Sequence, residues 1–238
     1  MKSVYFIVIV LVSGFTAGII HGAVNLAIVE PYLDQAISIE NQNLFATGLA
    51  EDTPQFWAEY SSYRDWQKSG QVLASGILGM SIGALFGIVF AYSRNALPKG
   101  HTIKKTFVLA AIMWLTIFLI PFLKYPANPP TVGDADTVVL RGILYLAFIA
   151  ISGFSAVGFS RLYKKLETKK YLAFVGYAVF ITTVFFIMPP SPDEVTAPMD
   201  LVNGFRTMSV VAVTTFWVAE AIILGLLWQK YKTKLQES

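Results

Sequence analysis

Long apolar blocks separated by short polar segments dominate the pattern along this chain. A helix of about 20 apolar residues crosses a hydrocarbon core of about 30 Å, and six blocks reach or approach that length. The blocks cover residues 4–29, 70–92, 106–123, 138–163, 171–188 and 207–228. The third and fifth are the shortest, but each ends at a Lys or a Pro and can still span with little tilt. The pattern therefore predicts an all-α membrane protein, a bundle of six transmembrane helices.

The first block begins directly after Lys2 and has to be distinguished from a secretory signal. Its apolar run continues well past the roughly 7 to 15 residues of a signal peptide, and it has no A-x-A cleavage pattern. We therefore expect a retained helix. With no segment left over for a soluble domain, residues 1–238 are predicted to form a single transmembrane domain.

The basic residues predict the orientation of the helices. Of the 18 Lys and Arg residues, 13 lie at Lys2, in segments 93–105 and 161–170, and in the tail after residue 229. The three remaining segments hold 12 of the 15 acidic residues and cover residues 30–69, 124–137 and 189–206. Positively charged loops stay in the cytoplasm. We therefore expect a protein of the cell membrane with both termini cytoplasmic and the three acidic segments outside.

The first acidic segment is predicted to contain helical structure. Thr53 and Pro54 are typical of a helix N-cap followed by proline at the first helical position. Aromatic residues then recur at helical spacing, at Phe56, Trp57, Tyr60, Tyr63 and Trp66. This element is either an interfacial helix in the outer headgroup layer or the outer start of the second span. Its aromatic residues form either a membrane belt or a ligand-stacking site, and a second short helix is expected at residues 31–39.

Composition excludes several classes of protein. Apolar residues make up 55% of the chain and charged residues 14%, against roughly 25% charged residues in a soluble domain. The absence of Cys excludes disulfides, iron–sulfur clusters, thiolate zinc sites and cysteine catalysis. No phosphate-binding or dinucleotide-binding glycine motif occurs, and the two His residues lie on opposite predicted sides of the membrane. We therefore expect no enzyme, no covalent cofactor and no nucleic-acid partner, since lipid and topology explain the short basic clusters.

Two helices carry glycine stripes. Small residues at four-residue spacing let helix backbones approach closely within a membrane. Such residues occur in the first two blocks at Gly14, Gly18, Gly22, Gly76, Gly79, Gly83 and Gly87. His21 and Asn25 lie beside the first stripe, so that this helix face turns polar toward its outer end. We expect that face to point into protein.

Glu220 is the most costly residue of the chain to insert into a membrane. It lies 14 residues after Arg206, or roughly 20 Å at about 1.5 Å per residue, and a buried carboxylate costs several kcal/mol unless it is protonated or paired. It is either part of a cation or proton relay or a neutral carboxyl bonded to a Ser, Thr or Tyr of a neighbouring helix. His21 is likewise either a ligand or a structural histidine.

The second and third acidic segments repeat one order of residues. Each has a double proline, then acidic residues, then an arginine, at Pro129-Pro130, Asp134, Asp136 and Arg141 and at Pro189-Pro190, Asp193, Glu194 and Arg206. Carboxylate and imidazole ligands suit divalent cations, and an acidic face concentrates cations. The candidate metal ligands are therefore His21, Glu30, Asp34, Asp134, Asp136 and Glu220. The two arginines are expected to pair with loop carboxylates and hold an outer gate, whereas the alternative is a solvated face that only supports topology.

The second acidic segment resembles the signature loop of the CbtA family of predicted cobalt transporters. The resemblance rests on Lys-Tyr-Pro-Ala-Asn-Pro-Pro at 124–130, Val-Gly-Asp at 132–134, Thr137 and Arg141. Residues 29–34 and the late Phe205-Arg206 segment are similar too. It implies a small multi-pass membrane protein that imports cobalt for cobalamin synthesis, sometimes beside a tiny His-containing companion subunit. Structural or gating positions would then be Lys124, Tyr125, Pro126, Asn128, Pro129, Pro130, Gly133, Arg141 and Arg206.

Two classes of function remain open. The first is a permease for cobalt or another divalent cation, which would enter through an acidic, Pro-rich outer vestibule and pass Glu220. The second is a non-transporting accessory subunit of a membrane complex, in which acidic loops and glycine stripes serve assembly. A single acidic residue deep in the membrane is fewer than an ion path usually needs. This favours a homo-oligomer or a companion membrane subunit as partners, in addition to the lipid bilayer.

Overall fold

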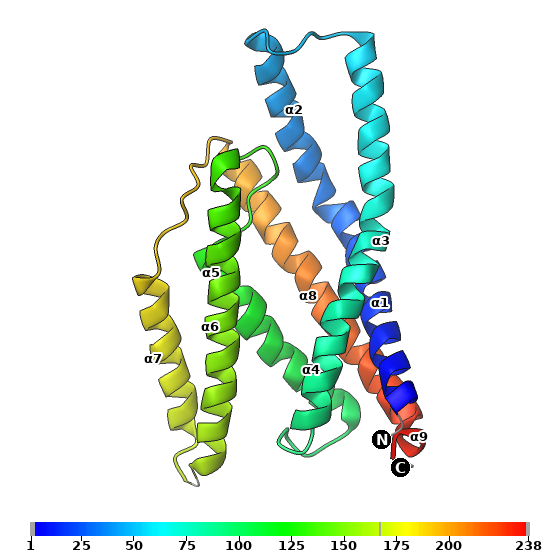
Figure 1. The fold of residues 1–238 in the computed structure, drawn as a ribbon, viewed down its shortest axis with the longest axis vertical. Helices are drawn as coiled ribbons and strands as arrows, with labels where there is room; N and C mark the ends of the chain where they lie inside the picture. Colours follow the sequence, from blue (N-terminus) through cyan, green and yellow to red (C-terminus); the bar gives the residue numbers. More distant parts are fainter. Residues whose placement is uncertain (1–2, 167, 237–238) are drawn as a thin grey trace. The chain divides into compact units, whose positions relative to one another are not determined.

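The computed structural model describes residues 3–166 and 168–236, where every regular element is a helix and irregular segments connect the helices (Figure 1). Its elements are α1 (Ser3–Ile28), α2 (Glu30–Ala46), α3 (Pro54–Ser93), α4 (Thr102–Met113), η1 (Trp114–Leu119), α5 (Ile120–Lys124), η2 (Ala135–Thr137), α6 (Val138–Lys165), α7 (Tyr171–Ile187), α8 (Met199–Lys230) and α9 (Lys232–Gln236). Five helical segments are long and apolar enough to cross a membrane, and the 17-residue α7 is a shorter apolar helix. The all-α class and a helix at each of the six predicted blocks are confirmed. Lys2 lies outside the described residues.

The described helices form two compact units. Unit 1 contains the chain up to residue 111, residues 129–131 and the chain from residue 197, and unit 2 contains residues 112–128 and 132–196. Unit 1 therefore holds α1, α2, α3, most of α4, α8 and α9, and unit 2 holds the end of α4, η1, α5, η2, α6 and α7. The single transmembrane domain over residues 1–238 stays a prediction.

The first acidic segment is a pair of helices, α2 and α3. Pro31 lies in the first turn of α2, where its missing N–H costs no hydrogen bond, and Leu33 N donates to Val29 O. The helix therefore continues to Ala46, past the predicted end at residue 39. Thr53 caps α3 by accepting a hydrogen bond from Phe56 N at 3.2 Å, as predicted.

The aromatic segment is the start of the second span, which was one of the two expected alternatives. From Pro54 to Ser93, α3 is one helix of 40 residues, in which no second proline interrupts the backbone hydrogen bonds. The separate helix of this segment is α2, which precedes it (Figure 1).

The two glycine stripes face each other between α1 and α3. A Cβ atom built on Gly14 would lie 2.9 Å from Gly83 Cα, and one built on Gly18 would lie 2.9 Å from Gly76 Cα. Real Cβ atoms do not come this close to backbone, so only glycine permits this separation of the helix axes. The glycine stripes are therefore packing surfaces.

The third predicted span is an α-helix interrupted by a π-helical turn. In η1 the hydrogen bonds reach one residue further than in an α-helix, and Ile120 N donates to Leu115 O. Pro121 follows at once and lacks a backbone N–H. The apolar pattern of residues 106–123 could not show this change, because a π-turn alters the backbone and not the composition.

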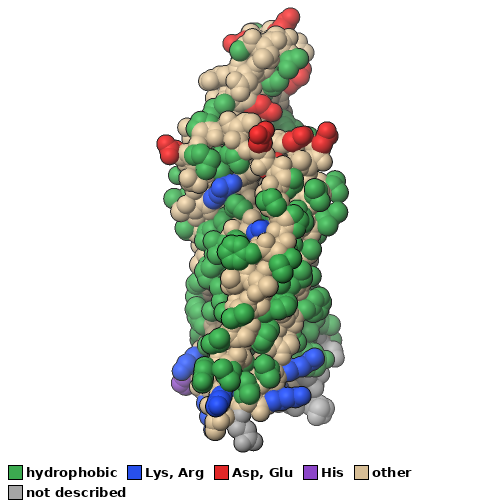
Figure 2. Space-filling model, turned by 90° about the vertical axis from the view of Figure 1, so that its left-hand side faces the viewer, with side chains coloured by type: hydrophobic (Ala, Val, Ile, Leu, Met, Phe, Trp, Pro, Cys, Tyr) green, Lys and Arg blue, Asp and Glu red, His purple; other side chains and the backbone are tan. Residues whose placement is uncertain are grey.

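The α6–α7 hairpin forms the core of unit 2. Its centre is made by Tyr125, Phe148 and Ile181. Basic residues cluster where the two helices join, at Arg161, Lys164, Lys165, Lys169 and Lys170. On the face shown in Figure 2, hydrophobic side chains occupy the middle, most Lys and Arg side chains lie at one end, and further Lys or Arg side chains lie in the other half, toward the acidic end. This is the distribution expected of a hairpin within a bilayer.

In unit 1, α8 begins at Met199, eight residues before the predicted start at residue 207. Pro198 precedes the helix and Asp200 lies in its positively polarised first turn. Leu201, Val202 and Phe205 are buried. The first turns of α8 are therefore amphipathic, and their apolar side packs against the rest of unit 1. The half-buried Arg206 therefore lies inside α8 and not at the entrance to the helix.

Candidate functional site

Two of the predicted metal ligands form an ion-pair cluster between α2 and α3. Arg64 of α3 donates to Glu30, and its Nη2 lies 2.8 Å from Asp34 Oδ1. Lys68 Nζ lies 2.8 Å from Asp34 Oδ2. The side chains of Arg64 and Glu30 are 9% and 7% exposed. The structure thus brings Glu30 and Asp34 together, but two cations neutralise them.

The same cations change the acidity of Asp34. Burial alone would raise its pKa, but hydrogen bonds and charge from Lys68 and Arg64 outweigh burial and hold the pKa below its ordinary value of 3.8. A carboxyl group with a lowered pKa stabilises the folded state at every pH above its ordinary value. That contribution is lost as pH falls through the lowered pKa.

Asp34 is therefore expected to contribute to stability at neutral pH and to stop contributing in acid. The difference in melting temperature between the wild type and Asp34→Asn should stay constant from pH 7 to pH 5. It should shrink below about pH 4, because the carboxylate is then protonated in the folded protein as well. Thermal unfolding in detergent over this pH range measures the difference. Asp65→Asn, a change at an exposed acid of α3, is the control, and a constant difference down to pH 2 would contradict the assignment.

Glu220 is completely buried within unit 1 and contacts α1. Ser13 Oγ lies 3.1 Å from Glu220 Oε1 and 3.1 Å from Val10 O. Glu220 Oε2 has no hydrogen-bond partner among the described residues. Because a hydroxyl has one proton, both contacts are satisfied when Ser13 donates to Val10 and a neutral Glu220 donates to Ser13. This geometry matches the second alternative, a carboxyl bonded to a Ser of a neighbouring helix, and it does not test the relay.

His21 lies two turns after Ser13 on α1 and is half-buried. Its ring packs edge-on against Phe216 of α8, with the ring centroids 6.3 Å apart. An aromatic neighbour supplies no metal ligand, so this contact fits a structural histidine. Its role as a ligand stays a prediction.

The two acidic loops of unit 2 meet at Asp193. Its carboxylate accepts a hydrogen bond from Arg141 Nη1 at 2.5 Å and one from Asn128 Nδ2 at 2.8 Å. The Asp134 backbone N lies 3.2 Å away. The expected pairing of Arg141 with a loop carboxylate is therefore present, and the carboxylate comes from the other loop. The gating role of Arg141 and Arg206 stays a prediction.

Asp134 and Asp136 are exposed on the first of these loops. Asp134 Oδ1 accepts a hydrogen bond from Asp136 N at 2.9 Å and so caps the short helix η2. The two carboxylates are therefore held within one turn of each other on a solvent-facing segment. Of the candidate ligands, they are the pair most accessible to an ion from solution.

The resemblance residues build the base of this loop. Tyr125 is buried, its hydroxyl donates to Pro189 O at 2.7 Å, and burial raises the pKa of that hydroxyl. Lys124 Nζ lies 5.0 Å from the ring centroid of Phe185. The remaining positions differ in exposure: Pro126 and Gly133 are half-buried, Pro129 is buried and Pro130 is exposed.

Sequence reasoning missed two central residues, Asp193 and Arg64. Asp193 lies in an acidic stretch, and nothing in its neighbours distinguishes it from Glu194. Arg64 had a usable signal, since it and Lys68 are the only basic residues in the acidic segment 30–69. Two cations among seven acids predict that ion pairs form, but they do not predict which acids take part.

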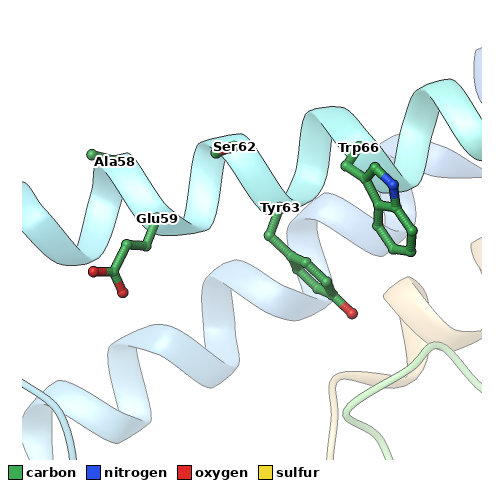
Figure 3. A pocket seen from close by; sticks show the side chains of 5 residues that line it. All are labelled: Ala58, Glu59, Ser62, Tyr63 and Trp66. Carbon is green, nitrogen blue, oxygen red and sulfur yellow. The ribbon is translucent and has the colours of Figure 1, made fainter.

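No assembled metal centre exists among the described residues: nowhere do three His, Asp or Glu side chains gather closely enough to hold an ion. A surface depression of about 630 Å³ is lined by residues of α3 alone, Ala58, Glu59, Ser62, Tyr63 and Trp66 (Figure 3). A single helix cannot enclose a ligand. Tyr63 and Trp66 stack on each other with centroids 5.9 Å apart, which suits an aromatic belt at a membrane surface.

Comparison with known proteins places the chain in a family. A family model described as "Probable cobalt transporter subunit (CbtA)" matches residues 4–229, nearly the whole chain. No curated protein and no solved structure matches it. This description names a probable transporter subunit, which is not a class of enzyme. The apolar helices, the loop at 124–141 and this match agree, and the chain belongs to the CbtA family of probable cobalt transporter subunits.

Proposed function

We propose that this chain carries cobalt, or a closely similar divalent cation, across the cell membrane into the cytoplasm. The observation that supports this most is the family match over residues 4–229. The distribution of charge supports the direction. Basic residues flank the helices at the side we assign to the cytoplasm, together with both termini, and acidic segments 30–69, 124–137 and 189–206 face outward.

Entry of the ion is assigned to the second acidic segment. Asp134 and Asp136 are exposed and close in sequence, and carboxylate oxygens are suitable ligands for divalent cations. Glu30 and Asp34 are already paired with Arg64 and Lys68. We therefore do not assign those two acids to direct coordination of the ion.

Within the membrane, the path is assigned to Glu220 and His21 of unit 1. An ionisable residue inside a transmembrane segment is costly and marks a functional site by default. Imidazole and carboxylate are both ligands that cobalt accepts. The only described partner of the Glu220 side chain is the Ser13 hydroxyl, so Glu220 Oε2 has capacity to bind an ion or a proton.

Uptake into proteoliposomes tests this path. Vesicles that contain a cobalt-sensitive fluorescent chelator would be compared with protein-free vesicles. Asp134→Asn with Glu220→Gln should lower the initial rate about tenfold or more, since the loss of a ligand worth about 1.4 kcal/mol changes an equilibrium constant tenfold. Asp65→Asn, which neutralises another exposed acid, should leave uptake unchanged. Full uptake by the double variant would exclude the proposed path.

A second candidate function is that of an accessory subunit. One observation favours it: among residues 3–166 and 168–236, no three metal-ligating side chains are gathered. The family description also names a subunit. In this case a companion membrane protein or a second copy of the chain supplies the missing ligands.

Titration calorimetry separates the two candidates. Metal-stripped protein would be titrated with cobalt, nickel, zinc and magnesium, with Asp134→Asn as the control. Saturable cobalt binding that weakens in the variant supports the permease. No binding at millimolar metal, together with a stable partner in a mild-detergent pull-down, supports the accessory subunit.

A further inference from the structure

Asp193 is a buried carboxylate in an irregular segment between α7 and α8. Its side chain is 1% exposed, although charged residues in loops are almost always exposed. A buried charge is tolerated only when it is paired and hydrogen-bonded. The surroundings of Asp193 therefore have to act as a binding site for it.

The donors to Asp193 all come from residues 128–141. They are Arg141 Nη1 at 2.5 Å, Asn128 Nδ2 at 2.8 Å and Asp134 N at 3.2 Å. Thr137 Oγ1 lies 3.2 Å from Asp193 Oδ1, but its single proton is shared with Asp134 O at 2.8 Å. One positive charge and several neutral donors converge on two oxygens. This composition matches a planar anion of single charge, which is a carboxylate.

The donor set is held in place by the loop itself. Asp134 Oδ1 accepts from Asp136 N, and Thr137 Oγ1 also lies 2.8 Å from Asp134 O. Arg141 is fixed in the first turn of α6. The chain therefore positions these donors through contacts that do not involve Asp193.

Gly133 leaves room for the bound carboxylate. Its φ is +104°, and a Cβ atom at this position would overlap the Asp193 carboxyl group. Any other residue would be both strained in its backbone and placed in the site. Space and donors are thus shaped around the same group.

We propose that residues 128–141 form a carboxylate receptor whose tethered ligand is Asp193, which fastens the segment between α7 and α8 to the loop before α6. Both carboxylate oxygens of Asp193 accept hydrogen bonds from residues 128–141. Asp193 therefore positions the loop that carries Asp134 and Asp136. A receptor of this kind should accept a small free carboxylate when the Asp193 side chain is removed. The proposal does not depend on metal transport.

Chemical rescue in the Cys-free chain tests the receptor. Val132→Cys places a single thiol at a buried position next to Gly133, and its labelling by a maleimide reports opening of the loop. Adding Asp193→Ala should raise the labelling rate about tenfold, because charge-assisted hydrogen bonds are lost. Formate or acetate should slow labelling again, whereas acetamide, which is neutral, should not.

Three further variants make the result specific. Glu194→Ala removes the adjacent exposed acid and should leave labelling unchanged. Arg141→Ala should raise labelling without rescue by formate, because the receptor then lacks its cation. Should Asp193→Ala fail to fold, Asp193→Asn should label faster than the wild type and ignore formate, since the amide fills the site.

The overturning results are equally definite. If the Asp193 variants label no faster than Glu194→Ala, the side chain does not fasten the loops. If formate does not slow labelling in a folded Asp193→Ala protein, the site is not a carboxylate receptor. Cobalt uptake is not read in this experiment, so its outcome is independent of the proposed function.

Discussion

Arg64→Gln is expected to lower the free energy of unfolding by about 3–5 kcal/mol, because it leaves a buried carboxylate without its cation. The Arg64 and Glu30 side chains are only 9% and 7% exposed. Arg64 also bonds Asp34 and donates to Gln67 Oε1 at 2.7 Å. Glutamine keeps some hydrogen-bonding capacity but supplies no charge to Glu30.

Chemical denaturation in mild detergent measures this effect, with fluorescence of Trp57 and Trp66 of α3 as a local reporter. Lys68→Gln is the matched control: it removes a cation one turn along the same helix, from a more exposed pair, and should cost no more than about 1 kcal/mol. In Glu30→Gln with Arg64→Gln, neutralising both partners should recover much of the loss. Equal, small effects of the Arg64 and Lys68 variants would show that the Arg64–Glu30 pair is not buried in the working protein.

Gly18→Leu is expected to separate α1 from α3 and to destabilise the protein by about 1–3 kcal/mol or more. Even a Cβ atom at Gly18 would lie 2.9 Å from Gly76 Cα. The neighbouring atoms are backbone, which cannot rotate away as a side chain can. The helices must therefore move apart, and the contacts along the whole stripe weaken.

Gly158→Leu is the control for this substitution. Gly158 lies within α6, also a membrane-spanning candidate, but a Cβ atom there meets nothing within 4 Å. Its replacement should be neutral or slightly stabilising, because glycine is a poor helix former. Melting temperature and the elution volume of the monomer-sized species would be compared for the two variants. A Gly18 variant as stable as the Gly158 variant would mean that α1 and α3 do not pack through their glycine stripes.

The local pattern of the sequence determined the helices and several of their ends. Six apolar blocks predicted six helices because a membrane span has a required length and needs no partner to be recognised. Thr53 and Pro54 predicted the start of α3 because capping depends on adjacent residues. The glycine stripes predicted close packing, although not that the stripe of α1 would meet the stripe of α3.

Only the tertiary structure decided which charged and polar side chains meet. Asp193 binds Arg141, 52 residues away, and Ser13 reaches Glu220, 207 residues away. Sequence reasoning expected a Ser, Thr or Tyr beside Glu220 but could not choose among them. The sequence pattern predicts Glu30 and Asp34 as candidate metal ligands, but it does not show that each pairs with Arg64. Local propensity sets backbone conformation over a few residues, but the partner of a buried charge is set by how distant segments pack.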